Sequence, residues 1–299
     1  MNKVAIFTGS GSDFYFKIEN LVKSLKRFKS FYKADLFILD VGLKEEQKKK
    51  LSKYAKKIIT PTDNFKFNFI IKNKWSRLYS SRPFIKNYAP GYETYMWIDS
   101  DIIVQKYQAL IDLEKITRNG KLGIVAESDN CYISDAVLNN EINDGYEKIY
   151  KNLYIRRGWT YKNLRKYFNE NTAENYSSFP CLNAGLFALP HDSHYWKLWR
   201  ELYQEALLKF NDETSVSMDQ TTLNLAIYSN IKSATILDSK YNFLVKRAMP
   251  VLNKSNLYCK PNFPQELIYC LHFTGIDMKK MYKLKNCNNK EIQTSFILN

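Results

Sequence analysis

Residues 96–104 have the sequence MWIDSDIIV, in which two acids, Asp99 and Asp101, stand inside an otherwise apolar stretch. The apolar residues Tyr95–Ile98 predict a buried strand that ends at the first acid. Burying a carboxylate is costly unless a cation or hydrogen-bond donors face it. At a strand end the two carboxylates can face a cleft and share a divalent cation with a diphosphate. The alternative interpretation of this triplet is an ordinary acidic turn.

Short apolar runs alternate with helical patterns on both sides of this stretch. Val4–Phe7 predicts a first buried strand, with a turn at residues 8–12, and a helix with apolar residues at helical spacing follows. The alternation predicts an α/β fold with a mixed, mainly parallel sheet flanked by helices, in which ligands bind beyond the C-terminal strand ends. Further strands are expected at Leu36–Leu39, 58–59, Leu122–Ala126, Leu182–Leu189 and Ile268–Phe273, and further helices at 193–210, 219–228 and Trp75–Tyr88, the last interrupted near Pro83.

The chain has 299 residues and no segment that resembles a linker, which predicts one domain over residues 1–285. Residues of about 130–178 are polar and rich in Asn and Tyr, and we interpret them as an insertion over the active-site face. Residues 286–299 are expected to form a basic C-terminal tail.

The formal net charge is +15, from 45 Lys and Arg against 30 Asp and Glu. The lysines are dispersed and no helix-turn-helix or zinc pattern occurs, so a nucleic-acid partner is not expected. The five cysteines form no CxxC pair, and no signal peptide or membrane-spanning run is apparent, which favours a cytoplasmic protein. The basic C-terminal residues predict peripheral contact with anionic lipid at the inner membrane face, or else a solvated end; they are Lys279, Lys280, Lys283, Lys285 and Lys290. The oligomeric state is left open.

The acidic stretch resembles the DxD strand of GT-A glycosyltransferases, which have a Rossmann-like fold, and of glycosyltransferase family 8 in particular. Three more segments resemble motifs of that family in its order: 183–187 (NAGLF), 219–224 (DQTTLN) and 271–275 (LHFTG). Arg82 stands upstream of the acids, where the family usually has a donor-contacting arginine. The resemblance extends from Val4 to Lys280.

The resemblance implies a retaining transfer from a nucleotide-sugar, with a UDP-sugar expected, to a glycan or lipid-linked acceptor. It assigns the metal to Asp99, Asp101 and His272, and these oxygen and imidazole ligands suit Mn²⁺ or Mg²⁺. Catalytic roles fall on Gln220, Asp219 and Asn183. Donor contacts fall, together with the two acids, on Thr8, Arg82, Ser100, Gly185, Gly275 and Lys279.

Each of these residues also has a structural interpretation. His272 could be a hydrogen-bonded core residue, and Asn183 with Gly185 could form a strand bulge. Asp219 could be a helix N-cap. Other side chains could be merely solvated or part of a loop: Gln220, Arg82 and Asp129.

The chain also departs from the family pattern in two places. The lysine after the LHFTG motif is displaced, so that Lys279 or Lys280 could take its role, and Pro-Trp is missing after it. The first loop, residues 9–13, lacks the usual acidic pair. A sugar nucleotidyltransferase, a basic nucleic-acid-binding module and an inactive or donor-hydrolysing transferase remain as alternatives.

Overall fold

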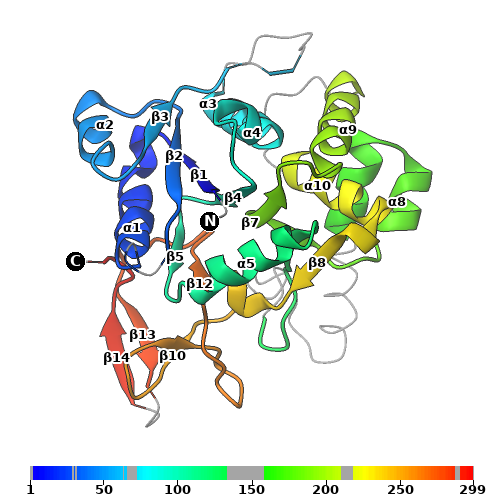
Figure 1. Cartoon of the computed structure of the whole chain (residues 1–299). Coiled ribbons are helices and arrows are strands. Elements are labelled where there is room, and N and C mark those ends of the chain that lie inside the picture. The colour runs from blue at the N-terminus through cyan, green and yellow to red at the C-terminus, as the bar shows by residue number, and fades with distance from the viewer. Residues whose placement is uncertain are drawn as a thin grey trace.

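The computed structural model describes residues 3–28, 30, 32–62, 64–65, 73–132, 158–209, 218–286 and 290–298. These residues build a seven-stranded sheet in the order β3-β2-β1-β4-β7-β6-β8 (Figure 1). Its strands are β1 (Val4–Ser10), β2 (Asp35–Asp40), β3 (Lys57–Ile59), β4 (Thr94–Ile98), β6 (Leu122–Ala126), β7 (Leu182–Pro190) and β8 (Ala234–Leu237). The predicted α/β fold is confirmed.

Most neighbouring strands of this sheet are parallel, as the sequence predicts. Strands β3, β2, β1 and β4 run in one direction, and β8 is parallel to β6. Strand β7 lies between β4 and β6 and is antiparallel to both. All nine residues of β7 are buried, which fits a central strand covered on both faces.

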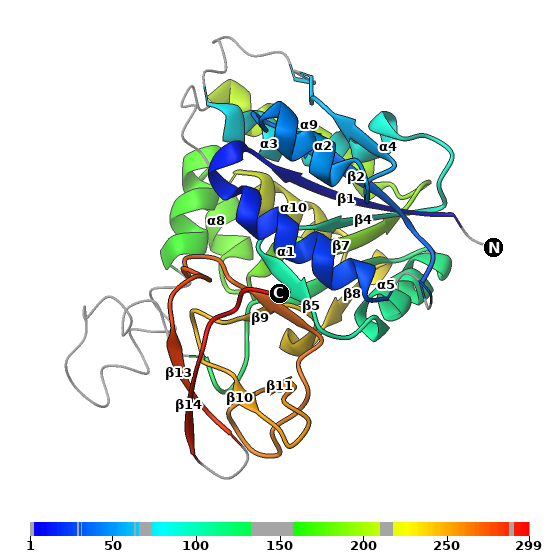
Figure 2. The same cartoon turned by 90° about the vertical axis from the view of Figure 1, so that its left-hand side faces the viewer.

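Helices cover both faces of the sheet (Figure 2). On one face, α3, α9 and α10 pack on alternate strand residues such as Phe7 and Trp97. On the other face, α1 and α5 pack on the intervening residues, such as Ile6 and Met96. This alternation is the period of two that a pleated strand imposes. The helices are α1 (Tyr15–Lys26), α2 (Glu45–Leu51), α3 (Lys74–Ser81), α4 (Ile85–Tyr88), α5 (Gln108–Arg118), α8 (Glu170–Tyr176), α9 (Tyr195–Lys209) and α10 (Met218–Ser229), with 3-10 turns η1 (Ser12–Phe14), η2 (Arg82–Phe84), η3 (Ile231–Ser233) and η4 (Ser239–Tyr241).

A second, three-stranded sheet joins the C-terminal third of the chain to the acidic stretch. Strand β12 (Cys270–His272) runs antiparallel to β5 (Ile102–Val104) and parallel to β9 (Phe243–Leu244). In this register His272 pairs with Ile102, and the Phe273 amide donates a 3.0 Å hydrogen bond to the Asp101 carbonyl. Two small antiparallel pairs lie nearby: β10 (Val251–Leu252) with β11 (Tyr258–Cys259), and β13 (Tyr282–Lys285) with β14 (Glu291–Thr294).

Two segments differ from the expectations drawn from sequence. Strand β1 continues through Ser10, so the turn begins later than residue 8. The described part of the expected tail contains β14, and Phe296 is buried against Phe273 with ring centroids 4.7 Å apart. The apolar side chain at 296 therefore holds residues 290–298 on the body of the protein, and this part is not a free tail.

The predicted insertion is described at residues 130–132 and from residue 158 onwards, because residues 133–157 lie outside the described part. Residues 158–167 are helical, and α8 follows them. Tyr167 and Ala173 pack with Tyr203 and Leu207 of α9. The described part of this segment thus rests on α9, and the predicted cover over the active-site face stays a prediction.

Candidate active site

The two acids and the distant histidine meet at the end of β4. The Nε2 atom of His272 lies 3.3 Å from Oδ1 of Asp101 and 3.8 Å from Oδ2 of Asp99. One ligand atom from each of the three residues lies within 4.8 Å of the others. His272 is buried, whereas both acids are partly open to solvent. The pairing of β12 with β5 therefore brings together the three residues that the sequence assigned to a metal.

Arg82 lies beneath the acids and is buried, so the interpretation of it as a surface residue is wrong. Its guanidinium donates to Oδ1 of Asp99 and to Oδ2 of Asp219, each at 2.5 Å. It also lies over the Trp97 and Tyr79 rings, 4.7 and 5.0 Å from their centroids. Asp219 is inside helix α10, where this ion pair fixes it.

Gly185 of β7 passes so close to the cluster that only glycine fits. A Cβ atom there would lie 2.6 Å from Cε1 of His272 and 2.8 Å from Oδ2 of Asp99. Asn183 accepts a 2.8 Å hydrogen bond from the Gly185 amide. The β6–β7 register shifts between Ile124 and Val125, beside this segment, which confirms the predicted irregularity.

A fourth carboxylate, Glu127, follows β6 and was not identified from the sequence. Its Oε1 accepts from the Asn183 side chain at 2.7 Å and from the Gln220 side chain at 3.1 Å. Arg247 lies 3.8 Å from its Oε2. Gln220 in turn accepts from the Ala184 amide at 3.1 Å, so it is not merely solvated. Glu127 thus joins two of the predicted catalytic residues into one network.

A cavity of about 320 Å³ opens in front of the acids. Lys17 of α1 reaches into it, and its Nζ lies 3.1 Å from Oδ2 of Asp101. Thr8 is fully buried inside β1, and Lys279 is exposed with its Nζ 4.3 Å from the Phe16 ring centroid. The cavity wall includes Gly9, Lys17, Arg82, Asp99, Ser100, Asp101, Thr274 and Gly275.

Comparison with known proteins places this geometry in a family. The model of glycosyl transferase family 8 matches residues 5–280. The chain belongs to glycosyl transferase family 8. It is therefore a glycosyltransferase, and the family assignment favours this interpretation over a nucleic-acid-binding module.

Solved structures agree with the GT-A fold of this family 8 chain. The galactosyltransferase LgtC, solved with donor and acceptor sugar analogues, is 13% identical with a TM-score of 0.52, over 90% of this chain and 86% of LgtC. Mouse xyloside xylosyltransferase 1 is 12% identical with a TM-score of 0.51, over 97% and 99% of the two chains. The bifunctional glycosyltransferase WbbM is 14% identical with a TM-score of 0.54, over 92% of this chain and 46% of WbbM. No curated protein sequence matches significantly.

The electrostatics of the family 8 site shift the pKa values of Asp101 and Asp219 in opposite directions. Burial alone would raise the pKa of Asp101, but His272 and Lys17 lower that pKa well below its usual range. Burial opposes protonation of His272, yet Asp101 and Asp99 raise its pKa overall. Burial raises the pKa of Asp219, and Arg82 opposes this shift. Positive groups of the protein therefore balance the negative charge of the acids.

The donor set of the site fits a hard or borderline divalent ion. Two carboxylate oxygens and one imidazole nitrogen suit Mn²⁺, and Mg²⁺ accepts the oxygen ligands. The missing side chain at Gly185 leaves the space between Asp99 and His272 open. The Nδ1 atom of His272 is buried without a hydrogen-bond partner among the described residues, so Nε2 is the ring atom that faces the acids.

Asp129, the second acid after β6, belongs to a separate ion cluster. Its Oδ2 accepts a hydrogen bond from Ser239 and lies 2.8 Å from the Lys260 ammonium. Lys260 also contacts Asp238 at 2.7 Å and Glu266 at 3.2 Å. These contacts support a structural role for Asp129 rather than a sugar contact.

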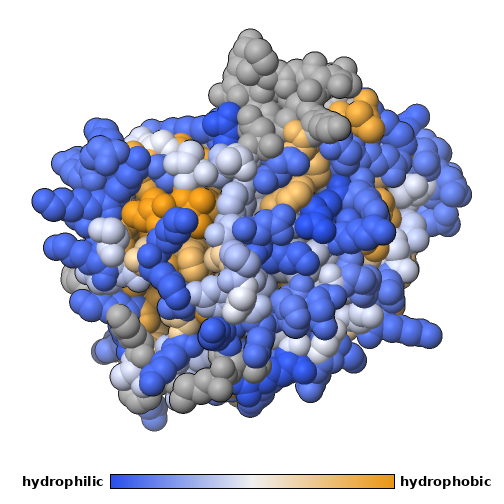
Figure 3. Space-filling view, turned by 45° about the horizontal axis from the view of Figure 1, so that its top comes forward, coloured by the Kyte–Doolittle hydropathy of each residue, from blue (hydrophilic) through white to orange (hydrophobic). Residues whose placement is uncertain are grey.

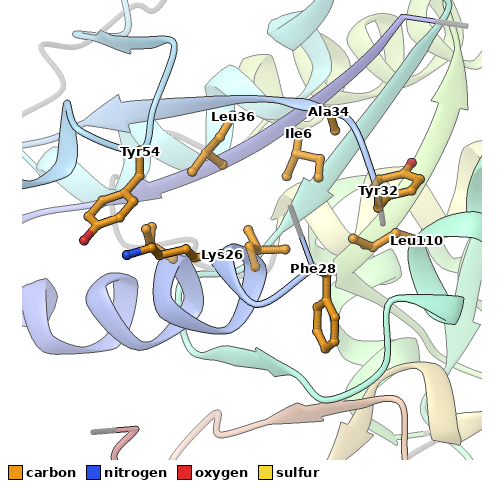
Figure 4. A pocket seen from close by; sticks show the side chains of 10 residues that line it. Ile6, Lys26, Phe28, Tyr32, Ala34, Leu36, Tyr54 and Leu110 are labelled. Atoms are coloured by element: carbon orange, nitrogen blue, oxygen red, sulfur yellow. The ribbon is translucent and has the colours of Figure 1, made fainter. Parts of the chain in front are cut away.

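A second pocket lies between α1 and the sheet (Figure 4). Its wall is mostly apolar, with Lys26, Tyr32 and Tyr54 as the polar exceptions. It has no acid or histidine on its wall, in contrast to the cavity at Asp99. We therefore assign the chemistry to the cavity at the acids. The surface seen in Figure 3 is mostly hydrophilic with smaller apolar patches, as the high charge implies.

Proposed function

We propose that this glycosyltransferase is metal-dependent and transfers a sugar, with retention, from a UDP-sugar to a glycan or lipid-linked acceptor. The observation that carries the proposal is the cluster of Asp99, Asp101 and His272 on the wall of the cavity. The cavity of about 320 Å³ has the size of a small-molecule site.

The reaction breaks the bond between the anomeric carbon and the diphosphate and forms a bond from that carbon to an acceptor oxygen. Asp99, Asp101 and His272 would hold Mn²⁺ or Mg²⁺, which supplies Lewis-acid stabilisation of the diphosphate charge. Arg82 fixes Asp99 and Asp219 through its two short ion pairs. The hydroxyl proton of the acceptor leaves with the diphosphate or passes to water.

The sugar would lie beside the network of Asn183, Gln220 and Glu127. Side-chain amides that are fixed by hydrogen bonds can orient sugar hydroxyls without large rearrangement. Asn183 and Gln220 are both fixed in this way, by Gly185, Ala184 and Glu127. The donor contacts proposed for Ser100 and Gly275 are supported by their place on the cavity wall. Those of Thr8 and Lys279 remain proposals from family resemblance.

The test is a screen of nucleotide-sugars with Mn²⁺ that measures the released nucleotide for wild type and Asp101→Asn. We expect UDP release from one UDP-sugar, and a loss of about 100-fold or more in the variant because the ion loses a ligand. Asp238→Asn, an acid in the Lys260 cluster, is the matched control and should retain activity. Release of pyrophosphate would instead support the nucleotidyltransferase alternative. NMR of the product tests whether the anomeric configuration is retained.

We also propose that the protein works in the cytoplasm and touches anionic lipid. The described residues contain no helix long and apolar enough to cross a bilayer. The lysines at 279, 280, 283, 285 and 290 are all exposed, which supports the lipid contact. Co-sedimentation with vesicles should increase with their content of anionic lipid. Binding that is indifferent to lipid charge would overturn this proposal.

A further inference from the structure

Lys17 is the lysine of the cavity wall, and its ammonium is bonded to a metal-ligand residue. It lies in the first turn of α1, with 14% of its side chain exposed. Its Nζ is 3.1 Å from Oδ2 of Asp101, while Oδ1 of the same carboxylate faces His272 at 3.3 Å. The sequence pattern of α1 gave this residue no function.

A divalent ion at this site would compete with the Lys17 ammonium, because both cations would bind the carboxylate of Asp101. Two positive groups a few ångströms apart repel each other, most strongly in a partly buried site. Asp101 has 15% of its side chain exposed, so water screens this repulsion only in part. The four-carbon stem of lysine is flexible and can carry the ammonium to another place in the cavity.

The donor's diphosphate would offer the Lys17 ammonium such a place. The wall that holds Lys17 also holds Gly9 and Gly275. A diphosphate that shares the ion with Asp101 would lie close to this wall. Lys279, the family-predicted contact, directs its ammonium at the Phe16 ring. Lys17 therefore supplies positive charge where the departing diphosphate requires it.

We propose that Lys17 is a mobile counter-cation, which leaves Asp101 when the divalent ion binds and then contacts the donor's diphosphate. The proposal rests on the proposed function of the site. It assigns Lys17 to the binding of a nucleoside diphosphate. Lys17 then weakens the binding of the metal ion alone and strengthens the binding of the nucleotide.

The test compares wild type with Lys17→Met in two equilibrium measurements. Titration with Mn²⁺ alone, followed by the EPR signal of free Mn²⁺, should show several-fold tighter binding in the variant, because the competing ammonium is gone. Titration of the Mn²⁺-loaded protein with UDP should show binding about tenfold weaker, as expected for the loss of a hydrogen bond to a charged group. Lys17→Arg keeps the charge and should restore most of the UDP affinity.

Lys26→Met is the matched control, because it removes one lysine from the exposed end of the same helix. It should change neither titration, and Lys17→Gln repeats the test should Lys17→Met unfold. Mn²⁺ affinity that falls or stays unchanged in Lys17→Met and Lys17→Gln would overturn the proposal, because a lysine that only orients Asp101 gives that result. Unchanged UDP affinity would overturn it as well. Failure of the wild type to bind either Mn²⁺ or UDP would refute the proposed function itself.

Discussion

Two clusters of buried charge among the described residues have different centres, one at Lys260 and one at the active-site acids. In the Lys260 cluster, one ammonium contacts Asp129, Asp238 and Glu266 within 3.2 Å. In the active-site cluster, the Nε2 atom of His272 lies 3.8 Å from Oδ2 of Asp99 and 3.3 Å from Oδ1 of Asp101. In the first cluster one protein cation thus contacts all three acids. In the second, of Asp99 and Asp101, Arg82 contacts only the former and Lys17 only the latter, and the imidazole faces both acids.

The comparison shows that the number of acids does not identify a metal site. Three carboxylates surround Lys260, yet the protein itself supplies the cation that they need. At the active site Arg82 lies to one side and bonds Asp99 through Oδ1, while Oδ2 faces the histidine. The place of the protein's own cations decides whether an acidic cluster can accept an ion.

The largest expected effect is on the free energy of unfolding, which should fall more when the active-site cluster loses Arg82 than when the other cluster loses Lys260. Arg82→Met leaves Asp99 and the fully buried Asp219 without their partner, and should lower the free energy of unfolding by about 3–5 kcal/mol. Lys260→Met should cost less, because half of the Asp238 side chain is exposed and water can solvate it. Urea unfolding of both variants measures the difference. A larger loss for Lys260→Met would contradict this ranking.

A second substitution changes the active-site centre without changing any charge. Gly185→Ala puts a methyl group 2.6 Å from the His272 ring and 2.8 Å from Asp99, so these ligands must move. We expect Mn²⁺ affinity to fall about 10-fold to 100-fold, the range seen when ligand orientation is disturbed. Calorimetric titration with Mn²⁺ measures this loss. Gly158→Ala, where an added Cβ atom meets no other described atom within 4 Å, controls for the loss of a glycine. Equal Mn²⁺ affinity in both variants would refute the expectation.

The smallest expected effect concerns pH at the Lys260 cluster. Burial would raise the pKa of Asp129, but hydrogen bonds from Lys260 and Ser239 lower it well below its usual value. A lowered folded-state pKa stabilises the protein above the unfolded pKa of about 3.9, and this stability is lost as the pH falls further.

Asp129→Asn should therefore lower the free energy of unfolding by about 1.5 kcal/mol at pH 7, and by clearly less at pH 3. Urea unfolding at the two pH values measures both differences. A penalty that is the same at both would show that the ion pair does not titrate in this way.

The strands of the sheet could be predicted from the sequence, because each strand is a short apolar run that can be recognised without knowing its partners. The interruption near Pro83 was also predictable, and the structure has α3, η2 and α4 there. The direction of β7 was not predictable, because a run of buried residues is apolar whichever way the strand runs. The packing of residues 290–298 on the body was not predictable, because their four apolar side chains stand in a short, otherwise polar segment; they are Ile292, Phe296, Ile297 and Leu298.

The site was predictable only where its residues form motifs. Asp99, Asp101 and His272 were identified in this way, and the structure brings them together. Glu127 and Lys17 were missed, since an acid after a strand and a lysine in a helix are common. Their roles depend on partners far along the chain: Glu127 meets Gln220, and Lys17 meets Asp101.

The pairing of β12 with β5 also has a consequence for biosynthesis. His272 reaches the acids only through this ladder, which joins residues 102–104 to residues 270–272. A ribosome must therefore translate residues 102 to 272 before the three side chains can meet. Nascent chains that stop before this strand would carry both acids and yet lack the imidazole of the proposed ion site.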